Sequence, residues 1–384
     1  MDSSQQGSAA ELVNSAELST RHIDQDGARI ELVIDQGEII AGCRTMPICE
    51  VELELKAGSP APVFALARAL DAVAPLQLSA LSKAQLGYQM LDGSADEPAR
   101  WMLLSLAGEM ATFEGFEAIA RACIHQFRLN QSTLGRTHSP VALHQARVAL
   151  RRLRSALSIF ETIVSDERFG YLQIGLRWIA RELDRARNLD VLLQRTSSAA
   201  VRAPLQQART HAYAAATAAL VSPRLRTLIL DLVEWITIGN WRVKSAVGIA
   251  DQRLESFAAI ALDRCRRRVR RRGRDWDRLD DEARHRLRIE AKKLRYASDF
   301  FAVLFPGTRA KHRHKLFLEP LRVLQTGLGD LNDRITSTAL LAEFGLPDEM
   351  GGTTTKDQRQ KHKSILIDAF QAYETLVEAK PFWR

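Results

Sequence analysis

A pattern of basic residues occurs twice in this chain of 384 residues, and the two copies are 141 residues apart. The first copy, from His144 to Arg154, reads H-x-x-R-x-x-x-R-R-L-R. The second, from His285 to Arg295, has lysines at two of the arginine positions. Every basic position recurs at the same offset, which indicates an internal duplication. A fold for this chain must therefore accommodate the same segment twice.

Steps of three, four and three residues place the basic side chains of each copy on one stripe of a helix. The adjoining face of the first copy is apolar and can be buried: Leu143, Leu150, Leu153, Leu157 and Phe160. Cations stacked on one helix repel each other, which is tolerable when the stripe faces water or a polyanion. A solvated face does not need the same residue types at the same steps twice. The repetition therefore favours a polyanion.

Charge is unevenly distributed along the chain, whose net charge is +8. Residues 1–95 hold 6 Lys and Arg against 13 Asp and Glu, whereas the remainder holds 48 against 33. The length suggests two or three domains, and the wealth of Ala, Leu and Arg favours helices. An acidic segment thus precedes a strongly basic one, and the basic one requires an anionic partner.

Several features point to the cytoplasm as the location of the chain. The first residues contain neither a basic nor an apolar segment, so we expect no signal peptide. No stretch approaches the roughly 20 apolar residues of a transmembrane helix. The four cysteines have neither disulfide nor metal-ligand spacing, which is typical of free thiols in a reducing compartment: Cys43, Cys49, Cys123 and Cys265.

The N-terminal segment has the alternating pattern of strands. Residues 1–20 are rich in Ser, Gln and Ala, and we expect them to be disordered. Alternation then predicts strands over 29–41, with a hairpin turn at Gln36-Gly37, and over 49–56. The glutamates of the last strand share one face, which is a solvated surface or a barrel interior that holds a metal or a cation. Helices are predicted over 60–76 and 79–90.

This segment resembles the C-terminal half of a CYTH domain, the triphosphate-tunnel fold. The matching stretches begin at Arg29, Cys49 and Leu81, and we place the partial domain at 21–91 and a linker at 92–105. The family's first strand, E-x-E-x-K, is absent from these residues, so the resemblance implies a remnant without triphosphatase activity. An upstream start codon is the alternative. The vestigial tunnel positions would be Glu31, Glu50, Glu52, Glu54 and Lys83.

The rest of the chain has helical periodicity almost to its end. Proline at a first helical position marks two starts, at Pro140 and Pro223. The predicted helices span 112–130, 140 onward, 171–195, 202–220, 223–238, 253–272, 280–304, 319–342 and 356–377.

Residues 106–384 resemble the CHAD domain in both halves, about 106–240 and 252–384. The similarity rests on the two basic helices, on Arg187-Asn188-Leu189-Asp190 and on Leu328 to Asp333. It implies a mainly α fold with two four-helix halves related by a pseudo-two-fold axis, preceded by the small α+β remnant. It also implies that the basic helices line a groove that binds inorganic polyphosphate, with association with polyphosphate granules in a bacterial cytoplasm.

The expected polyphosphate-binding residues lie on the duplicated helices and on the helices that follow them. They are His144, Arg147, Arg151, Arg152, Arg154, Arg177, Arg181, His285, Arg288, Lys292, Lys293, Arg295 and Arg322. Arginine forks hold two phosphate oxygens at once, whereas lysine acts as a point charge. We expect no catalytic residue, no metal and no cofactor. The run 264–274 contains eight arginines, which cover most of the helix circumference. We therefore expect part of this run to be solvated.

Three other functions compete with polyphosphate binding. A nucleic-acid binder fits the charge, but the stripes lack interleaved aromatic residues for base stacking. An inorganic triphosphatase requires a complete CYTH domain upstream. In a third alternative, the acidic N-terminal remnant covers the basic groove in an interaction scaffold. The oligomeric state stays open.

Overall fold

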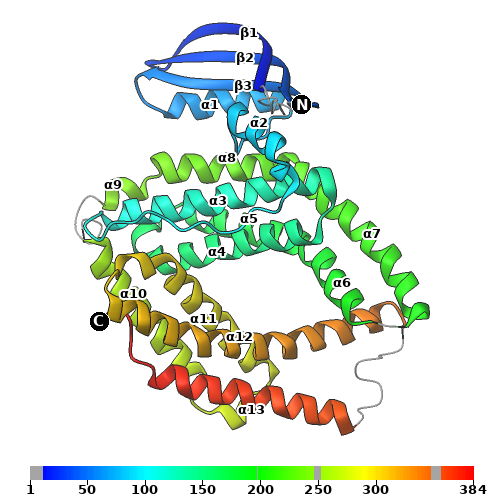
Figure 1. Ribbon diagram of the computed structural model, residues 1–384. Helices are drawn as coiled ribbons and strands as arrows, with labels where there is room; N and C mark the ends of the chain where they lie inside the picture. The colour runs from blue at the N-terminus through cyan, green and yellow to red at the C-terminus, as the bar shows by residue number, and fades with distance from the viewer. Residues whose placement is uncertain (1–11, 197, 246–251, 347–355) are drawn as a thin grey trace, which may run out of the picture. The chain divides into compact units, whose positions relative to one another are not determined.

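The computed structural model describes residues 12–196, 198–245, 252–346 and 356–384, which form two compact units (Figure 1). The first, which we name the sheet unit, comprises Met1–Arg100, His125–Ala146 and Leu220–Gly239. The second, the helical unit, comprises Trp101–Ile124, Arg147–Ala219 and Asn240–Arg384. The N-terminal segment therefore shares its unit with parts of the first repeat.

Three long antiparallel strands form the sheet in the order β1-β2-β3: Leu12–Gln25, Ala28–Ala41 and Arg44–Ala57. The first hairpin turns at Asp26-Gly27, where both residues have positive φ, and the second turns at Gly42. The predicted turn at Gln36-Gly37 is wrong, because both residues pair with β3 in the middle of β2. An Asp-Gly pair is itself a strong turn sequence.

The expected disorder of residues 1–20 is wrong from Leu12 onward, because β1 pairs with β2 along its whole length. Backbone hydrogen bonds with β2 hold this segment in an extended conformation. Residues 1–11 lie outside the described part of the chain.

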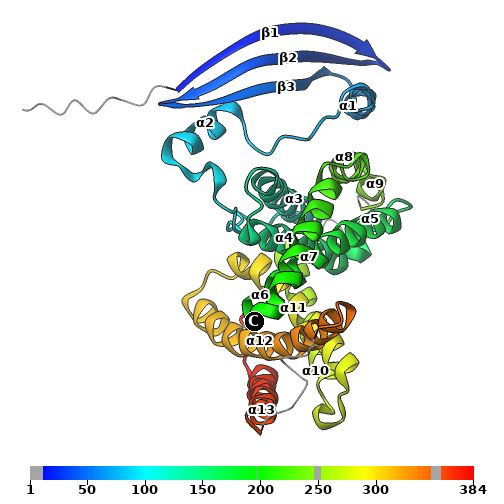
Figure 2. The same cartoon turned by 90° about the vertical axis from the view of Figure 1, so that its right-hand side faces the viewer.

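Two helices, α1 (Ala61–Val73) and α2 (Lys83–Asp92), lie on the same face of the sheet (Figure 2). A capping box at Ser82 starts α2, since its hydroxyl accepts from the Gln85 amide and the Gln85 side chain accepts from the Ser82 amide. Met90 of α2 packs in a small core with Ile39, Ala41 and Ile48. A 3-10 turn, η1 (Ser94–Asp96), begins the segment that we expected to be a linker.

The first repeat contains α3 (Thr112–Thr137), α4 (Pro140–Val164), α5 (Phe169–Glu182), α6 (Asp184–Arg195), α7 (Ala199–Val221), α8 (Pro223–Ile238) and the short α9 (Trp241–Ser245). Both starts predicted from proline are confirmed. The single helix predicted over 171–195 is wrong, because the chain breaks at Leu183 into α5 and α6. Leu183 keeps helical dihedral angles, and no proline or glycine marks the break in the sequence.

The second repeat contains α10 (Leu254–Arg272), α11 (Asp281–Phe301), α12 (Thr308–Glu343) and α13 (Lys356–Glu378), with 3-10 turns at Trp276–Arg278 and Ala302–Leu304. The start predicted near Glu319 is wrong: α12 begins at Thr308 and continues through the buried Pro320. Proline removes one backbone hydrogen bond from a helix, and here apolar packing of Phe317, Leu321 and Leu324 compensates.

Aromatic side chains from both repeats share one core in the helical unit. Phe160 of α4 stacks on Phe257 of α10 with ring centroids 4.7 Å apart, and Phe116 of α3 lies 5.4 Å from Phe160. Phe301 of α11 lies 5.9 Å from Phe160. The mainly helical fold with a small N-terminal sheet is confirmed. Within the described residues, no helix has the length and apolar character required to cross a membrane.

Candidate functional site

The duplicated basic helices are α4 and α11, and each has the predicted buried face. In α4 the five apolar residues Leu143, Leu150, Leu153, Leu157 and Phe160 are all at most 2% exposed. Their burial fixes the rotation of the helix and thereby the direction of the basic stripe beside them. In α11, Leu287, Ala291 and Leu294 have the same role.

Lys292 of α11 lies among cations that belong to both copies of the stripe. Its pKa is lowered to about 6, first by burial and then by the guanidinium groups of Arg151, Arg288 and Arg147, while Asp333 acts in the opposite direction. No described residue forms a hydrogen bond or an ion pair with Lys292. Because Arg147 and Arg151 come from α4, the structure brings the two stripes together around this lysine.

Carboxylates from the neighbouring helices partly neutralise this cluster. Asp184, the first residue of α6, pairs with Arg147. Asp333 of α12 lies 3.8 Å from Arg288. Asp330, also of α12, lies 3.0 Å from Arg195 at the end of α6. The pattern of basic residues does not indicate these carboxylates, although the segments around 183–190 and 328–333 resemble each other in the two repeats.

Tyr296 connects the two helices within the cluster. Its side chain is fully buried, and its phenol oxygen accepts a hydrogen bond of 2.7 Å from Nε of Arg151. The guanidinium group of Arg295 lies 4.8 Å from the centre of the tyrosine ring, within the range of a cation–π interaction. Tyr296 follows the second stripe directly, but a tyrosine carries no charge and the charge pattern therefore did not select it.

Arg152 and Lys293, which occupy equivalent positions in the two copies, have partners of their own beside the cluster. Arg152 is 7% exposed, and its guanidinium group lies 4.5 Å from the ring centre of Trp101 and 3.5 Å from Asp299. Lys293 pairs with Glu290 at 3.6 Å. Consecutive residues of a helix are rotated by about 100°, so Arg152 and Lys293 lie outside the stripe to which Arg151 and Lys292 belong.

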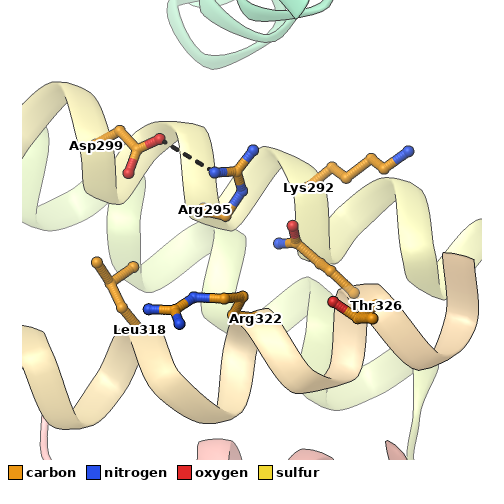
Figure 3. Close-up of a pocket in the computed structure, with 7 residues that line it drawn as sticks. Lys292, Arg295, Asp299, Leu318, Arg322 and Thr326 are labelled. Carbon is orange, nitrogen blue, oxygen red and sulfur yellow. Dashed lines mark ion pairs between the residues drawn. The ribbon is translucent and has the colours of Figure 1, made fainter. Parts of the chain in front are cut away.

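A pocket of about 430 Å³ extends the cluster between α11 and α12. Figure 3 shows Lys292 and Arg295 on one helix and Arg322 and Thr326 on the facing helix. Arg295 pairs with Asp299 at 3.7 Å, and Arg322 with Glu319 at 3.2 Å. The remaining lining residues are Leu318 and Gln325. The pocket therefore presents three cations and two neutral hydrogen-bonding side chains beside a single carboxylate.

Arg154, Arg177, Arg181 and His285 flank the cluster within the helical unit. Arg154 lies near Arg177 and Arg181 of α5, and burial followed by these charges lowers its pKa, although Asp184 opposes the effect. His285 forms a 2.7 Å hydrogen bond with Oδ1 of Asn332, for which Nδ1 must carry the proton, so that Nε2 is left for another partner. His144 is half-buried on α4, in the part of the helix that belongs to the sheet unit.

In the sheet unit, lysines engage the expected tunnel carboxylates. Lys83 of α2 pairs with Asp35 and lies 2.7 Å from Glu52 and 3.4 Å from Glu50. Lys56 lies 2.9 Å from both Glu31 and Glu54.

Burial opposes the charge of Lys83, but hydrogen bonds to Asp35 and Glu52 raise its pKa above the ordinary value. Asp35, which is 3% exposed, had not been predicted. Glu52 and Glu54 are exposed on this open three-stranded sheet, as the solvated-surface interpretation expects, and Lys83 and Lys56 pair with them there. Among the described residues, no group of three or more His, Cys, Asp and Glu side chains is arranged to hold a metal ion.

Comparisons with known proteins give three findings. The family model described as CHAD domain matches residues 118–342. The crystal structure of the CHAD domain from the plant Ricinus communis superposes with a TM-score of 0.60 and 26% sequence identity, over 74% of this chain and 97% of that one. An inorganic triphosphatase from Haemophilus influenzae is 37% identical over 75 residues, which are 20% of this chain. The chain thus spans 21% of the length of that relative.

Proposed function

This chain belongs to the CHAD domain family, its N-terminal strands fit part of a CYTH domain, and we propose that its helical unit binds inorganic polyphosphate. The observation that carries the proposal is the convergence of Arg147 and Arg151 with Arg288 and Lys292. Polyphosphate is a flexible line of charge without bases, so a site for it requires closely spaced cations and little else. Two copies of one stripe meet that requirement.

The depressed pKa of Lys292 supports an anionic ligand at this position. A lysine among three arginines is unfavourable in its charged form unless an anion lies beside it. Phosphate oxygens would provide that anion and would at the same time accept from the forks of Arg151 and Arg288. The site is therefore incomplete in electrostatic terms until a polyanion binds.

We assign different roles to the expected residues. Phosphate contact is assigned to the stripes and to the two ends of the cluster, namely Arg147, Arg151, Arg154, Arg177, Arg181, His285, Arg288, Lys292, Arg295 and Arg322. A supporting role within the fold is assigned to Arg152, which is buried against the rings of Trp101 and Tyr296, and to Lys293, which pairs with Glu290. We assign no role to His144, which belongs to the sheet unit.

The carboxylates within the cluster explain why a polymer is favoured over a single phosphate. Asp184 and Asp333 already satisfy Arg147 and Arg288 in part. A ligand must displace them, and a chain that contacts many cations at once gains enough interaction to do so. A small anion must displace the same carboxylates but gains only one contact with a cation in return.

Binding and competition measurements test the proposal. Titration of a labelled long-chain polyphosphate should give an affinity that falls steeply with salt, because binding releases counterions. Double-stranded DNA at equal charge concentration should leave most of the polyphosphate bound. If DNA displaces polyphosphate equally well, the site is a general polyanion sink and the proposal is wrong.

Triphosphate hydrolysis is the second candidate function, because the relative from Haemophilus influenzae is named an inorganic triphosphatase. We propose that the described sheet does not perform this reaction. Its carboxylates are paired with Lys56 and Lys83, and such pairing competes with a divalent metal for the same oxygens. A phosphate-release assay with Mg²⁺ and with Mn²⁺ distinguishes the two functions.

A further inference from the structure

The arginine run of α10 is divided by the structure into two groups with different surroundings. Arg264 donates to the carbonyl oxygen of Ile159, and Arg266 donates to those of Val377 and Ala379 at the end of α13. These two arginines hold helices together. No described residue forms a side-chain hydrogen bond or an ion pair with the others: Arg267, Arg268, Arg270, Arg271, Arg272 and Arg274.

Three of these arginines form one stripe, which we name the α10 stripe: Arg267, Arg271 and Arg274. Arg267 and Arg271 are one helical turn apart, and Arg274 follows the helix end at Gly273. The buried face of α10 is formed by residues such as Cys265 and Val269, and a step of two residues rotates about 200°. The α10 stripe therefore lies opposite the buried face, and all three side chains are exposed.

This surface is distinct from the site on α4 and α11. Cys265, on the buried face of α10, lies close enough to Lys293 and Glu290 of α11 for their charges to act on its thiol. Lys292, by contrast, lies among Arg151, Arg288 and Arg147. The α10 stripe is thus directed away from α11 and makes no contribution to the cluster around Lys292.

We propose that the α10 stripe binds the phosphate backbone of a nucleic-acid duplex. Arginine is suited to phosphate because its fork donates to two oxygens. The three side chains lie on the exposed face of α10, so they can contact a ligand from one side only. A duplex is a rigid array that presents its phosphates on its outer surface, where such a face can reach them.

Two features of the surface agree with backbone contact to a duplex. The run 264–274 contains no aromatic residue, so it offers no ring on which the bases of a single strand could stack. Arg271 also lies in the last turn of α10, where the partial negative charge of the helix end stabilises a cation. The arrangement can therefore remain unpaired in the free protein without loss of the helix.

The test compares three variants in titrations of labelled DNA and RNA duplexes at several salt concentrations. Arg267→Glu with Arg271→Glu and Arg274→Glu should weaken binding of at least one duplex roughly tenfold or more and lower the salt slope by about three. The control Arg309→Glu with Lys311→Glu and Lys315→Glu reverses as many exposed charges at the start of α12. Its affinity for the duplex should stay within roughly threefold of that of the unaltered chain. At about 0.15 M salt, distant charges are largely screened, so the net charge alone has a weak effect.

A third variant separates this surface from the polyphosphate site. Arg147→Glu with Arg151→Glu should retain duplex binding even though it loses polyphosphate. Equal losses from the α10 and α12 variants would overturn the proposal, as would loss of duplex binding in the Arg147 variant. Tighter binding of a single strand of equal charge would also overturn it. Circular dichroism of each variant ensures that losses are not due to unfolding.

Discussion

Arg151 of α4 donates a hydrogen bond of 2.7 Å to the phenol oxygen of Tyr296 on α11. The bond joins the two copies of the duplicated segment at the centre of the basic cluster. It also fixes the Nε side of the guanidinium group, which leaves the two terminal nitrogens for an anion.

Replacement of Tyr296 by Phe removes this bond while the ring stays in place. The free energy of unfolding should fall by about 1 kcal/mol, as for a hydrogen bond lost within a protein, and polyphosphate affinity should fall because Arg151 is less well oriented. Urea denaturation and titration measure the two effects. Tyr88→Phe, at a position that is 64% exposed, is the control and should change neither.

Charge reversal of one stripe should have a much larger effect on affinity. Arg147→Glu with Arg151→Glu should lower polyphosphate affinity roughly tenfold or more and flatten the salt dependence, since two phosphate contacts are lost. Arg271→Glu with Arg272→Glu changes the net charge equally but lies outside the cluster. If both double variants lose the same affinity, net charge rather than the repeated stripe is responsible for binding.

Lys292 makes both stability and binding depend on pH. Its pKa is about 6 in the folded chain, below the ordinary value of 10.5, so the unfolded state binds more protons between these values. The contribution of Lys292 to the free energy of unfolding therefore increases as pH rises through this window. Denaturation across this pH range should show a slope that Lys292→Met removes and Lys293→Met retains.

The same lysine should couple polyphosphate binding to proton uptake. An anion beside Lys292 raises its pKa, so the complex holds a proton that the free protein has lost above about pH 6. Affinity should decline as pH rises above that value. Calorimetry in two buffers with different ionisation enthalpies measures the uptake, and a result without buffer dependence would contradict this coupling.

Removal of a competing carboxylate should strengthen binding. Asp333→Asn frees Arg288, from which Asp333 lies 3.8 Å, and should raise polyphosphate affinity several-fold, on the order of 1 kcal/mol. The free protein should at the same time become less stable because cations in the cluster repel each other more strongly. Asp368→Asn, an exposed position on α13, is the control for the change in net charge.

The sheet unit should release no phosphate from triphosphate with Mg²⁺ or Mn²⁺. Its carboxylates are paired with lysines, and Lys83 is held by Asp35, Glu50 and Glu52. Phosphate release that is lost on Glu52→Ala with Glu54→Ala would show that these carboxylates are catalytic and would overturn the expectation.

The helical fold and the convergence of charge could be predicted from sequence where a pattern was both local and repeated. The apolar face of α4 and the proline at its start are local features, and the duplication identified α11 as its counterpart. The break at Leu183 has no local cause in the sequence, and it makes Asp184 the first residue of α6. Asp184 therefore could not be connected with Arg147 in advance.

Sequence adjacency was misleading where neighbouring residues diverge. Arg151 and Arg152 are consecutive and both basic, yet a rotation of about 100° separates a cluster residue from a buried one. The predicted turn at Gln36-Gly37 rests on the conformational freedom of glycine, whereas pairing with β3 keeps this pair extended. In both cases the outcome depends on contacts with a distant segment, which a single sequence does not contain.

The stacking of Phe160 on Phe257 has a consequence for the independence of the two repeats. A repeat that buries its own apolar residues can be excised and still fold, as an independent module would. Here each copy uses aromatic rings of the other as its interior, so we expect neither half to keep a closed core when expressed alone. The two copies are related to their common core as the two subunits of a dimer are to a shared interface.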